Sequence, residues 1–192
     1  MCFLYARLRL RVNETKSAVA RVTGRKFLGY SFWFAKGEVK RKVAVKALAT
    51  FKQRVRQLTR RSGGRGMAEV IERLRPYLLG WKAYFGLAQT PGIWRSLDEW
   101  LRHWLRAIQL NHWKRGTTMY RELRKLGAPT QVAQRVAATS RRWWCNSDGD
   151  IKRVLTIAYI ERLGVPRLLA PRLLEPPGAD PHAGWCGRGA VR

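Results

Sequence analysis

The first part of the chain alternates between apolar and polar residues, which is typical of β-strands. Between residues 7 and 12, arginine alternates strictly with leucine or valine, so side chains of one kind share one face. Further short strands are predicted at 18–22 and 26–34, and after a turn at 36–37 the chain returns over 39–43 as a hairpin. Because a lone hairpin is only marginally stable in water, these strands need a packing partner.

From residue 44 onward, apolar residues recur every three or four positions and predict helices. The first helix carries one apolar stripe, formed by Val45, Leu48, Val55 and Leu58. The second helix begins near Met67 and continues to Phe85, and Pro76 inside it predicts a kink or a break near Arg75. Aromatic residues dominate core burial, so Trp81 on this second stripe is expected to be a core residue.

The third helical stripe follows a loop at 90–92, and Ser96 is a plausible N-terminal cap for it. Its members are Leu97, Trp100, Leu101, Trp104, Leu105 and Ile108. Trp100 and Trp104 are expected to be core residues for the same reason as Trp81. Together the three stripes predict a three-helix unit.

A second, smaller helical section is predicted after the three-helix unit. It comprises a helix that ends at Gly127, a short helix over 131–138, a turn at 146–149 and a last helix over 151–163. Towards the C-terminus the composition shifts to Pro and Gly with little periodicity, and the segment 170–192 is expected to be disordered. The predicted fold class is mainly α with a small N-terminal antiparallel β region, an α+β arrangement.

The charge balance of the chain indicates what kind of partner it binds. Lys and Arg number 39 against 12 Asp and Glu, which gives a formal net charge of +27. Such an excess repels itself in a compact chain, and a polyanion is its usual reason, because each phosphate contact releases a counterion. A membrane is a weaker alternative, since no predicted helix pairs a lysine-rich face with a clean apolar face and no apolar run is long enough to span a bilayer.

Basic residues gather in the first third of the chain, which holds only two acids. Beside Phe27, Trp33 and Phe51 they suit a groove that follows a phosphate backbone, and RNA is bound by such Arg and aromatic side chains. Trp143 and Trp144 suit either stacking on RNA or local packing. The residues predicted to bind RNA are Arg41, Lys42, Lys46, Lys52, Arg54, Arg60, Arg61, Arg65, Lys82, Lys114, Arg115, Arg141 and Arg142.

Few residues offer catalytic or metal-binding chemistry. The three cysteines are widely separated, so neither a zinc site nor a disulfide framework is indicated, and a reducing, cytoplasmic location is expected. The three histidines are scattered and are expected to face solvent, although Asn111-His112 hints at a nuclease-like pair. Asp148 and Asp150 flank Gly149 in a turn, which does not provide the rigid carboxylate pair of a two-metal site.

One segment carries a resemblance to a known family. The stretch from Arg65 to Phe85, with Leu74-Arg75-Pro76 followed by Leu79-Gly80-Trp81, resembles the core of the group II intron maturase-specific domain. This domain is the thumb or X region of bacterial intron-encoded reverse transcriptases. The resemblance implies that the partner is structured RNA.

Other motifs resemble the same family and occur in its order. Residues 8–17 resemble the late palm motif, in which Asn13 and Lys16 form the Asn-x-x-Lys element. Phe27, Leu28, Gly29 and Tyr30 resemble the family segment that supports the primer end. Residues 123–165 resemble the region that follows the thumb in class C intron proteins.

The resemblance implies four segments along the chain. These are a palm remnant with a β-hairpin at 1–43, a thumb-like maturase-specific helical bundle at 44–115, a C-terminal helical section at 116–169 and the tail at 170–192. The family's catalytic Tyr-x-Asp-Asp motif, which binds magnesium, belongs before Leu8 and has no counterpart here. We therefore expect a chain truncated at its N-terminus, with no polymerase activity of its own and no bound cofactor.

The function implied by the resemblance is a grip on structured group II intron RNA during splicing. In the full-length family the same helices hold the template-primer, so an RNA/DNA duplex is a second expected partner. Two alternatives stay open. One is a decayed fragment without function. The apolar faces of the hairpin, which have no packing partner, favour this alternative. The other is the thumb subunit of a split reverse transcriptase, completed in trans by a chain that bears palm and fingers.

Overall fold

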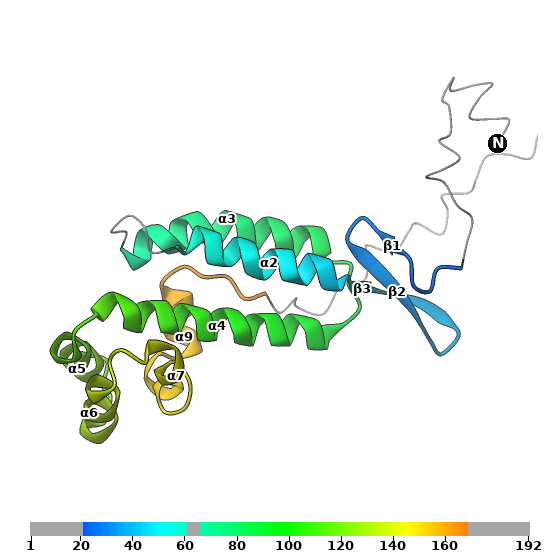
Figure 1. The fold of residues 1–192 in the computed structure, drawn as a ribbon. Coiled ribbons are helices and arrows are strands. Elements are labelled where there is room, and N and C mark those ends of the chain that lie inside the picture. The colour runs from blue at the N-terminus through cyan, green and yellow to red at the C-terminus, as the bar shows by residue number, and fades with distance from the viewer. Residues whose placement is uncertain (1–20, 61–65, 169–192) are drawn as a thin grey trace, which may run out of the picture.

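The computed structural model describes residues 21–60 and 66–168, which form a helical bundle with a small sheet at one end (Figure 1). The elements are β1 (Lys26–Phe27), β2 (Tyr30–Ala35), β3 (Glu38–Val43), α2 (Val45–Leu58), α3 (Met67–Phe85), α4 (Pro91–Trp113), α5 (Gly116–Lys125), α6 (Thr130–Ala138), α7 (Trp143–Asn146), α8 (Ile151–Val154) and α9 (Ile157–Arg162). The predicted fold class is confirmed. The predicted strand at 7–12, most of the strand at 18–22, and the tail lie outside the described residues, and Arg21 and Val22 are not part of a strand.

The sheet is antiparallel with the strand order β1-β2-β3. Tyr30 of β2 pairs with Val43 of β3, and the register continues to the predicted hairpin turn at Lys36-Gly37. The single strand predicted over 26–34 is wrong, because the chain turns at Leu28 and Gly29, whose φ angles are 48° and 79°. Such positive φ angles suit glycine, which carries no Cβ.

The close packing of the sheet on the bundle explains where this turn falls. A Cβ on Gly29 would lie 3.1 Å from the ring of Phe85 in α3. The Gly29 carbonyl also accepts a hydrogen bond of 2.9 Å from the Ala44 amide, just before α2 begins. The chain therefore turns where only a small residue fits against the end of α3.

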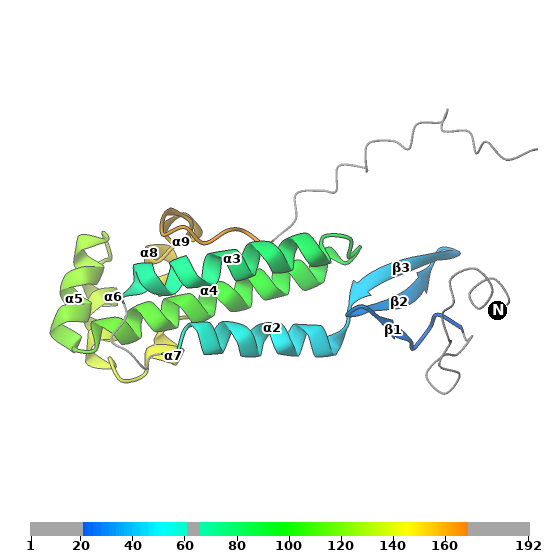
Figure 2. The ribbon, with the colours of Figure 1, turned by 90° about the horizontal axis from the view of Figure 1, so that it is seen from above.

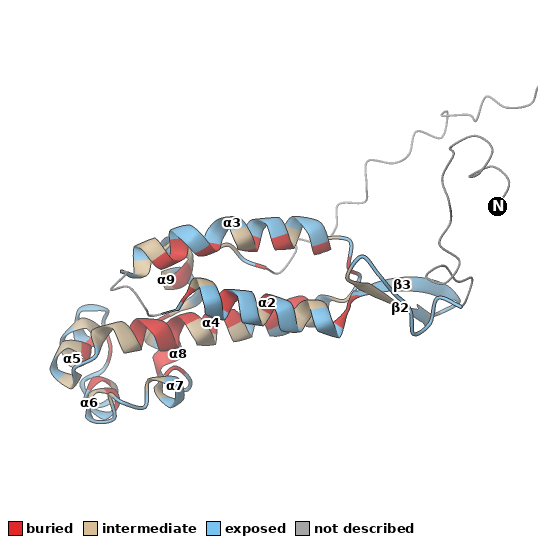
Figure 3. Ribbon diagram, turned by 45° about the horizontal axis from the view of Figure 1, so that its top comes forward, coloured by how far each residue is buried: buried red, intermediate tan, exposed pale blue. Residues whose placement is uncertain are grey.

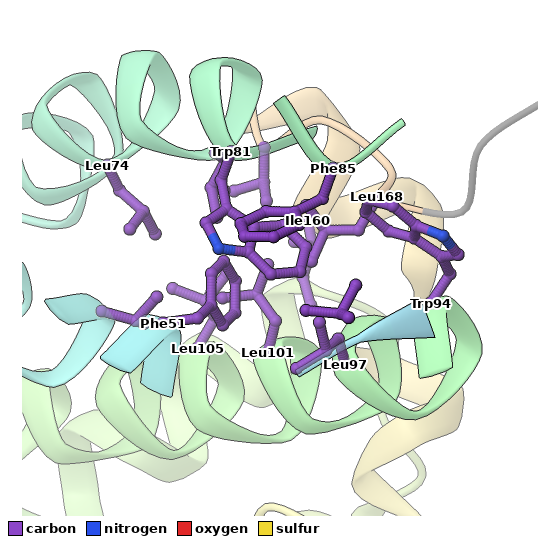
Figure 4. Close-up of a cluster of buried hydrophobic side chains, with 14 of the residues drawn as sticks. Phe51, Leu74, Trp81, Phe85, Trp94, Leu97, Leu101, Leu105, Ile160 and Leu168 are labelled. Atoms are coloured by element: carbon purple, nitrogen blue, oxygen red, sulfur yellow. The ribbon is translucent and has the colours of Figure 1, made fainter. Parts of the chain in front are cut away.

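Helices α2, α3 and α4 run side by side (Figures 1 and 2) and bury their apolar faces against one another (Figure 3). The fully buried centre includes Leu74 and Leu78 of α3 and Leu101 and Leu105 of α4. Trp81 is buried among them, as predicted, and Figure 4 shows its ring between the other labelled side chains of this cluster.

Two details of the predicted first helix are wrong. Phe51, placed by the sequence pattern beside an RNA groove, is completely buried and its ring centroid lies 4.6 Å from that of Trp81. Val45, placed on the apolar stripe, is 77% exposed at the first turn of α2. The buried face of α2 therefore passes through Phe51 and Val55, which are one helical turn apart.

The boundaries of α3 and α4 also differ from prediction. Helix α3 continues through Pro76 without a break, because buried residues on both sides of Pro76 pack into the same core. Helix α4 begins at Pro91, so residues 91–92 are helical and Ser96 lies inside the helix instead of capping it. Proline is well tolerated at a first helical position, where the missing N–H has no partner in the helix.

A second hydrophobic cluster lies beyond the C-terminal half of α4. It contains the completely buried Leu110 of α4 and Met119 and Leu123 of α5, together with residues of α6 and the segment after it. Helix α5 is followed by Gly127 at a φ of 83°, and α6 forms where a short helix was predicted. Figure 1 places α5 and α6 at the end of the bundle opposite the sheet.

The last predicted helix is divided in two. The chain leaves the helical conformation at Leu155, and Thr156 starts α9 by accepting a 3.2 Å hydrogen bond from the Tyr159 amide through its side chain. A threonine cap of this kind is a normal helix start. The division lets Ile151 pack into the second cluster while Ile160 returns to the first.

Candidate nucleic-acid interface

A cleft of about 590 Å³ opens between the C-terminal halves of α2 and α4 and the first residue of α7. Figure 2 shows α7 close to the end of α2. The cleft, called the α2–α4–α7 cleft below, is lined by Gln53, Arg56, Gln57, Thr59, Arg60, Trp104, Ile108, Asn111, His112 and Trp143. No lining residue is acidic, whereas two are arginine, so the cleft has a positive potential.

Two pairs of residues, each spaced by four positions, meet at the edge of this cleft. Trp100 and Trp104 stack with ring centroids 5.9 Å apart and planes 15° apart. Arg56 Cζ lies 5.5 Å from the Trp100 centroid and 5.7 Å from the Trp104 centroid. Lys52 Nζ lies 5.4 Å from the Trp100 centroid. Cation–π contacts of this kind hold charged groups at fixed positions on the surface.

The ring of Trp104 is fixed by a hydrogen-bonded chain. Its Nε1 donates to Thr59 Oγ1 over 2.9 Å, and the buried Thr59 hydroxyl donates to the Val55 carbonyl over 2.8 Å. The prediction that Trp100 and Trp104 are core residues is wrong in part, because both are only half-buried. They pack on the core with one part and border the surface with the other, next to basic side chains.

Within the described part of the chain, neither Arg56 nor Arg60 forms an ion pair with a carboxylate. Arginine guanidinium groups that no carboxylate neutralises suit phosphate oxygens, which they bind in a fork geometry. The α2–α4–α7 cleft therefore combines aromatic rings with unneutralised cations, which is the composition of an RNA-binding surface.

The two tryptophans of α7 have different surroundings. Trp144 lies edge-on to His103 at 4.1 Å and to Trp104 at 5.7 Å, measured between ring centroids. Trp143 lines the cleft, and its ring meets that of Trp144 at 86° with the centroids 6.4 Å apart. Local packing thus describes Trp144, although 41% of it is exposed. Trp143 both packs against the second hydrophobic cluster and lines the cleft.

A second cleft of about 550 Å³ borders Trp100 and has mixed charge. It includes the acids Glu99 and Asp148 beside Arg106 and His103. The expectation that the histidines face solvent is wrong for His103 and His112, which are both half-buried, while His182 lies outside the described residues. His103 lies 3.2 Å from the Ser147 hydroxyl through Nε2. Burial lowers the pKa of His103, and burial is also the main reason that the pKa of Arg106 is lowered.

The predicted RNA-binding residues are dispersed over several elements. Lys52 and Arg60 join Arg56 around the α2–α4–α7 cleft, whereas Arg41 and Lys42 lie on β3 at the other end of α2. The exposed members outside the cleft are Arg41, Lys42, Lys46, Arg54, Lys114, Arg115, Arg141 and Arg142, while Arg61 and Arg65 lie outside the described residues.

Two of the predicted RNA-binding residues make side-chain hydrogen bonds within the protein. Lys82 donates to the Arg167 carbonyl over 2.8 Å and so ties α3 to the segment after α9. Arg54 donates to Gln57 Oε1 over 3.2 Å along the exposed side of α2. Their charges can still act on a polyanion, but Lys82 is half-buried.

The sequence did not single out Arg56, Trp104 or Trp143 as members of one site. The four-residue spacing of the basic pair and of the tryptophan pair was visible, and it places each pair on one side of its helix. What the spacing could not show is that the two sides face each other across the bundle.

The primer-support-like segment forms the turn between β1 and β2. The Tyr30 hydroxyl donates to the Tyr84 carbonyl over 2.5 Å, and the Tyr84 hydroxyl donates to the Leu28 carbonyl over 2.9 Å. Burial raises the pKa of Tyr30, so its hydroxyl keeps the proton that it donates. Phe27 and Leu28 are each 65% exposed. The late palm residues Asn13 and Lys16 lie outside the described residues.

Neither metal binding nor membrane crossing is indicated by the described residues. No group of three or more His, Cys, Asp or Glu side chains among them is placed to hold a metal ion. None of the described helices combines the length and the apolarity that crossing a membrane requires.

A comparison with known protein families gives a match that covers most of α2 and all of α3, α4 and α5. Residues 48–127 match the family described as group II intron, maturase-specific domain. No curated protein matches the chain. The match confirms the resemblance inferred from the sequence and supports a maturase-related role in intron splicing. The matched domain is the maturase-specific one and not the polymerase catalytic domain.

Proposed function

We propose that this chain binds folded group II intron RNA through the basic and aromatic surface around the α2–α4–α7 cleft. The observation that carries the proposal is the position of Arg56 over the stacked Trp100 and Trp104 rings, beside a cleft without acidic residues. RNA is recognised by its shape, by its phosphates and by unstacked bases, and this surface offers groups for each.

The contribution of the chain to splicing is binding alone. Arginine and lysine side chains hold phosphates that the folded intron brings close together, and their charge lowers the repulsion between those phosphates. A protein that binds the folded RNA more tightly than the unfolded RNA shifts the population towards the folded form. The bond-making steps belong to the RNA, and we place the activity in the cytoplasm.

A second candidate function rests on the sheet. Phe27, Leu28, Phe34 and Val39 are large apolar residues that are each at least 46% exposed. Such a group of exposed side chains suits a protein partner, and a chain that bears palm and fingers would complete a split reverse transcriptase that holds an RNA/DNA duplex. Co-purification of the chain with the product of a neighbouring reading frame tests this candidate.

RNA affinity measured over a salt series tests the main proposal. Each phosphate contact contributes about −0.7 to −0.9 to the slope of log affinity against log salt. For six or more contacts, affinity for a structured intron RNA is expected to fall by roughly three orders of magnitude between about 50 and 200 mM salt. Weak binding that does not change with salt would contradict the proposal.

The Arg56 side chain provides the local test. Arg56→Gln is expected to weaken binding and to reduce the salt slope by about one contact. Arg73→Gln is the matched control, because Arg73 lies on α3, which contributes no residue to the cleft, and pairs with Glu69 at 3.3 Å. Equal effects of the two substitutions would show that net charge, and not the cleft, determines binding.

A further inference from the structure

We propose that the α2–α4–α7 cleft binds a single unpaired base of the RNA, and that Trp143 is the surface on which this base stacks. The inference rests on the proposed function and adds the kind of RNA element that the site selects. A bulge or loop nucleotide is the element that can turn its base away from a helix and into a protein cleft.

The cleft has the size and shape for such a base. Its volume of about 590 Å³ lies in the roughly 300–1,000 Å³ range of sites for small ligands. The cleft is open to solvent, so a nucleotide that stays attached to its strand can enter. A double helix is far too wide to do so, and phosphates of paired regions can therefore contact only the rim.

Trp143 is half-buried: its side chain packs against the second hydrophobic cluster and also lines the cleft. Within the described residues, its one aromatic contact is the nearly perpendicular meeting with Trp144. Trp104, by contrast, stacks on Trp100 and is held by Thr59, so it forms a rigid wall. A base inserted between this wall and Trp143 gains the stacking that it loses on leaving its own helix.

Polar groups at the rim match the remaining parts of a nucleotide. The exposed Gln53 side chain forms no hydrogen bond with any other described residue, so its amide can both donate to and accept from a base edge. Arg56 of α2 and Arg60, which follows the end of α2, both line the cleft, where they can reach the phosphates on either side of the inserted base. The cleft thus presents stacking, edge-reading and phosphate-binding groups together.

Three RNA hairpins that differ at one position test the inference at a single salt concentration. The first carries one bulged adenosine, the second carries an abasic residue in the bulge, and the third has no bulge. The chain is expected to bind the first about tenfold more tightly than the other two, as one stacked base is worth roughly five- to a hundredfold. Replacing the bulged adenosine by 2-aminopurine should give a fluorophore that is quenched on binding.

Substitutions then locate the base. Trp143→Ala should remove the preference for the bulged hairpin, and Trp143→Phe, which keeps a ring and fills most of the space, should retain part of it. Gln53→Ala should change the order of preference among four bulged bases while affinity for the abasic hairpin stays the same. Phe34→Ala is the control, because Phe34 is an exposed aromatic residue of β2, which contributes no residue to the cleft.

The outcomes separate this inference from the proposed function. Equal affinity for the three hairpins, together with strong salt dependence, overturns the base site and leaves RNA binding intact. A preference that survives in Trp143→Ala, with an unchanged thermal melt, also overturns it. Absence of salt-dependent binding to every hairpin and to intron RNA overturns both proposals.

Discussion

Asp98 joins α4 to the segment after α9 through one carboxylate. Its Oδ2 accepts a hydrogen bond of 2.5 Å from Arg102 Nη2, and its Oδ1 accepts one of 3.1 Å from the Leu168 amide. Arg102 Nη2 also lies 3.9 Å from Glu161 Oε1 of α9. The Arg102 and Asp98 side chains are only 9% and 13% exposed, so water cannot replace these contacts.

Asp98→Asn tests this arrangement. The substitution leaves the buried guanidinium of Arg102 without its closest negative charge, and breaking one side of a buried pair costs about 3 kcal/mol. Urea denaturation should show a free energy of unfolding lower by about that amount. Arg73→Gln, which removes an exposed i,i+4 pair, should change it by less than about 0.5 kcal/mol. Similar losses for both variants would contradict the prediction.

His103 makes the stability depend on pH. Burial lowers its pKa, Arg106 and Lys152 lower it further, and Asp148 opposes them. The unfolded chain therefore takes up this proton more readily than the folded chain. The contribution of neutral His103 to the free energy of unfolding is fully present above the ordinary histidine pKa of about 6.5. It is lost as the pH falls below that value.

The measurement is a set of urea midpoints between about pH 7.5 and 5, above the range in which carboxylates titrate. The midpoint should fall towards pH 5 in the natural sequence and should change less in His103→Gln. The carboxylates with lowered pKa, Asp148, Glu122 and Glu161, contribute at lower pH only. An identical pH profile for His103→Gln would exclude the histidine as the cause.

Single residues of the cleft were harder to predict than the core. The burial of Leu74 and Leu101 follows from helical spacing, because the apolar stripe of a helix packs against the core. Trp100 and Trp104 have the same spacing, yet they lie at the edge of the apolar stripe. How much of each ring is exposed there depends on how far the neighbouring helix covers it. That distance is a property of the packed bundle, not of the stripe.

Pro76 is an unfavourable residue inside α3. It removes one backbone hydrogen bond and its ring crowds the carbonyl four residues before it. Pro76→Ala should raise the free energy of unfolding by about 1–3 kcal/mol. Gly80→Ala in the same helix, where an added Cβ meets nothing within 4 Å, should give a smaller gain of about 0.5–1 kcal/mol. A loss of stability in Pro76→Ala, seen by urea denaturation, would mean that a distortion of α3 at the proline is needed for packing.

The existence of most helices followed from the sequence, while their ends did not. Periodicity predicted the bundle and the two helices α5 and α6, because a face of apolar residues must be buried somewhere. It could not predict the turn at Leu28 and Gly29 or the division at Thr156. Both interruptions serve contacts between distant segments, with Phe85 in the first case and with two separate hydrophobic clusters in the second.

The two hydrophobic clusters are expected to unfold together. Helix α4 contributes Leu101 to one and Leu110 to the other, and Tyr159 packs against both. Leu74→Ala and Leu123→Ala, one in each cluster, should each lower the free energy of a single unfolding transition by about 2–5 kcal/mol. Leu87→Ala, at a side chain that is 53% exposed, is the control with little effect.

Circular dichroism during urea denaturation distinguishes a folded domain from a decayed fragment. One cooperative transition in the natural sequence supports the first, since only a packed core unfolds in this way. Two separate transitions, each shifted by one of the two core substitutions, would show that the clusters are independent. A gradual change without a transition would support decay of the fold.

The charge of the whole molecule predicts opposite effects of salt on folding and on RNA binding. A formal net charge of +27 repels itself most strongly in the compact state, and salt screens this repulsion beyond about 10 Å at 0.1 M. Raising NaCl from about 0.05 to 0.5 M should therefore raise the urea midpoint while RNA affinity falls. The exposed ion pairs among the described residues weaken with salt, but each contributes less than about 1 kcal/mol. A midpoint that fell together with RNA affinity would mean that local ion pairs outweigh the net repulsion. Opposite trends would show that the same net charge lowers the stability of the chain and strengthens its binding to a polyanion.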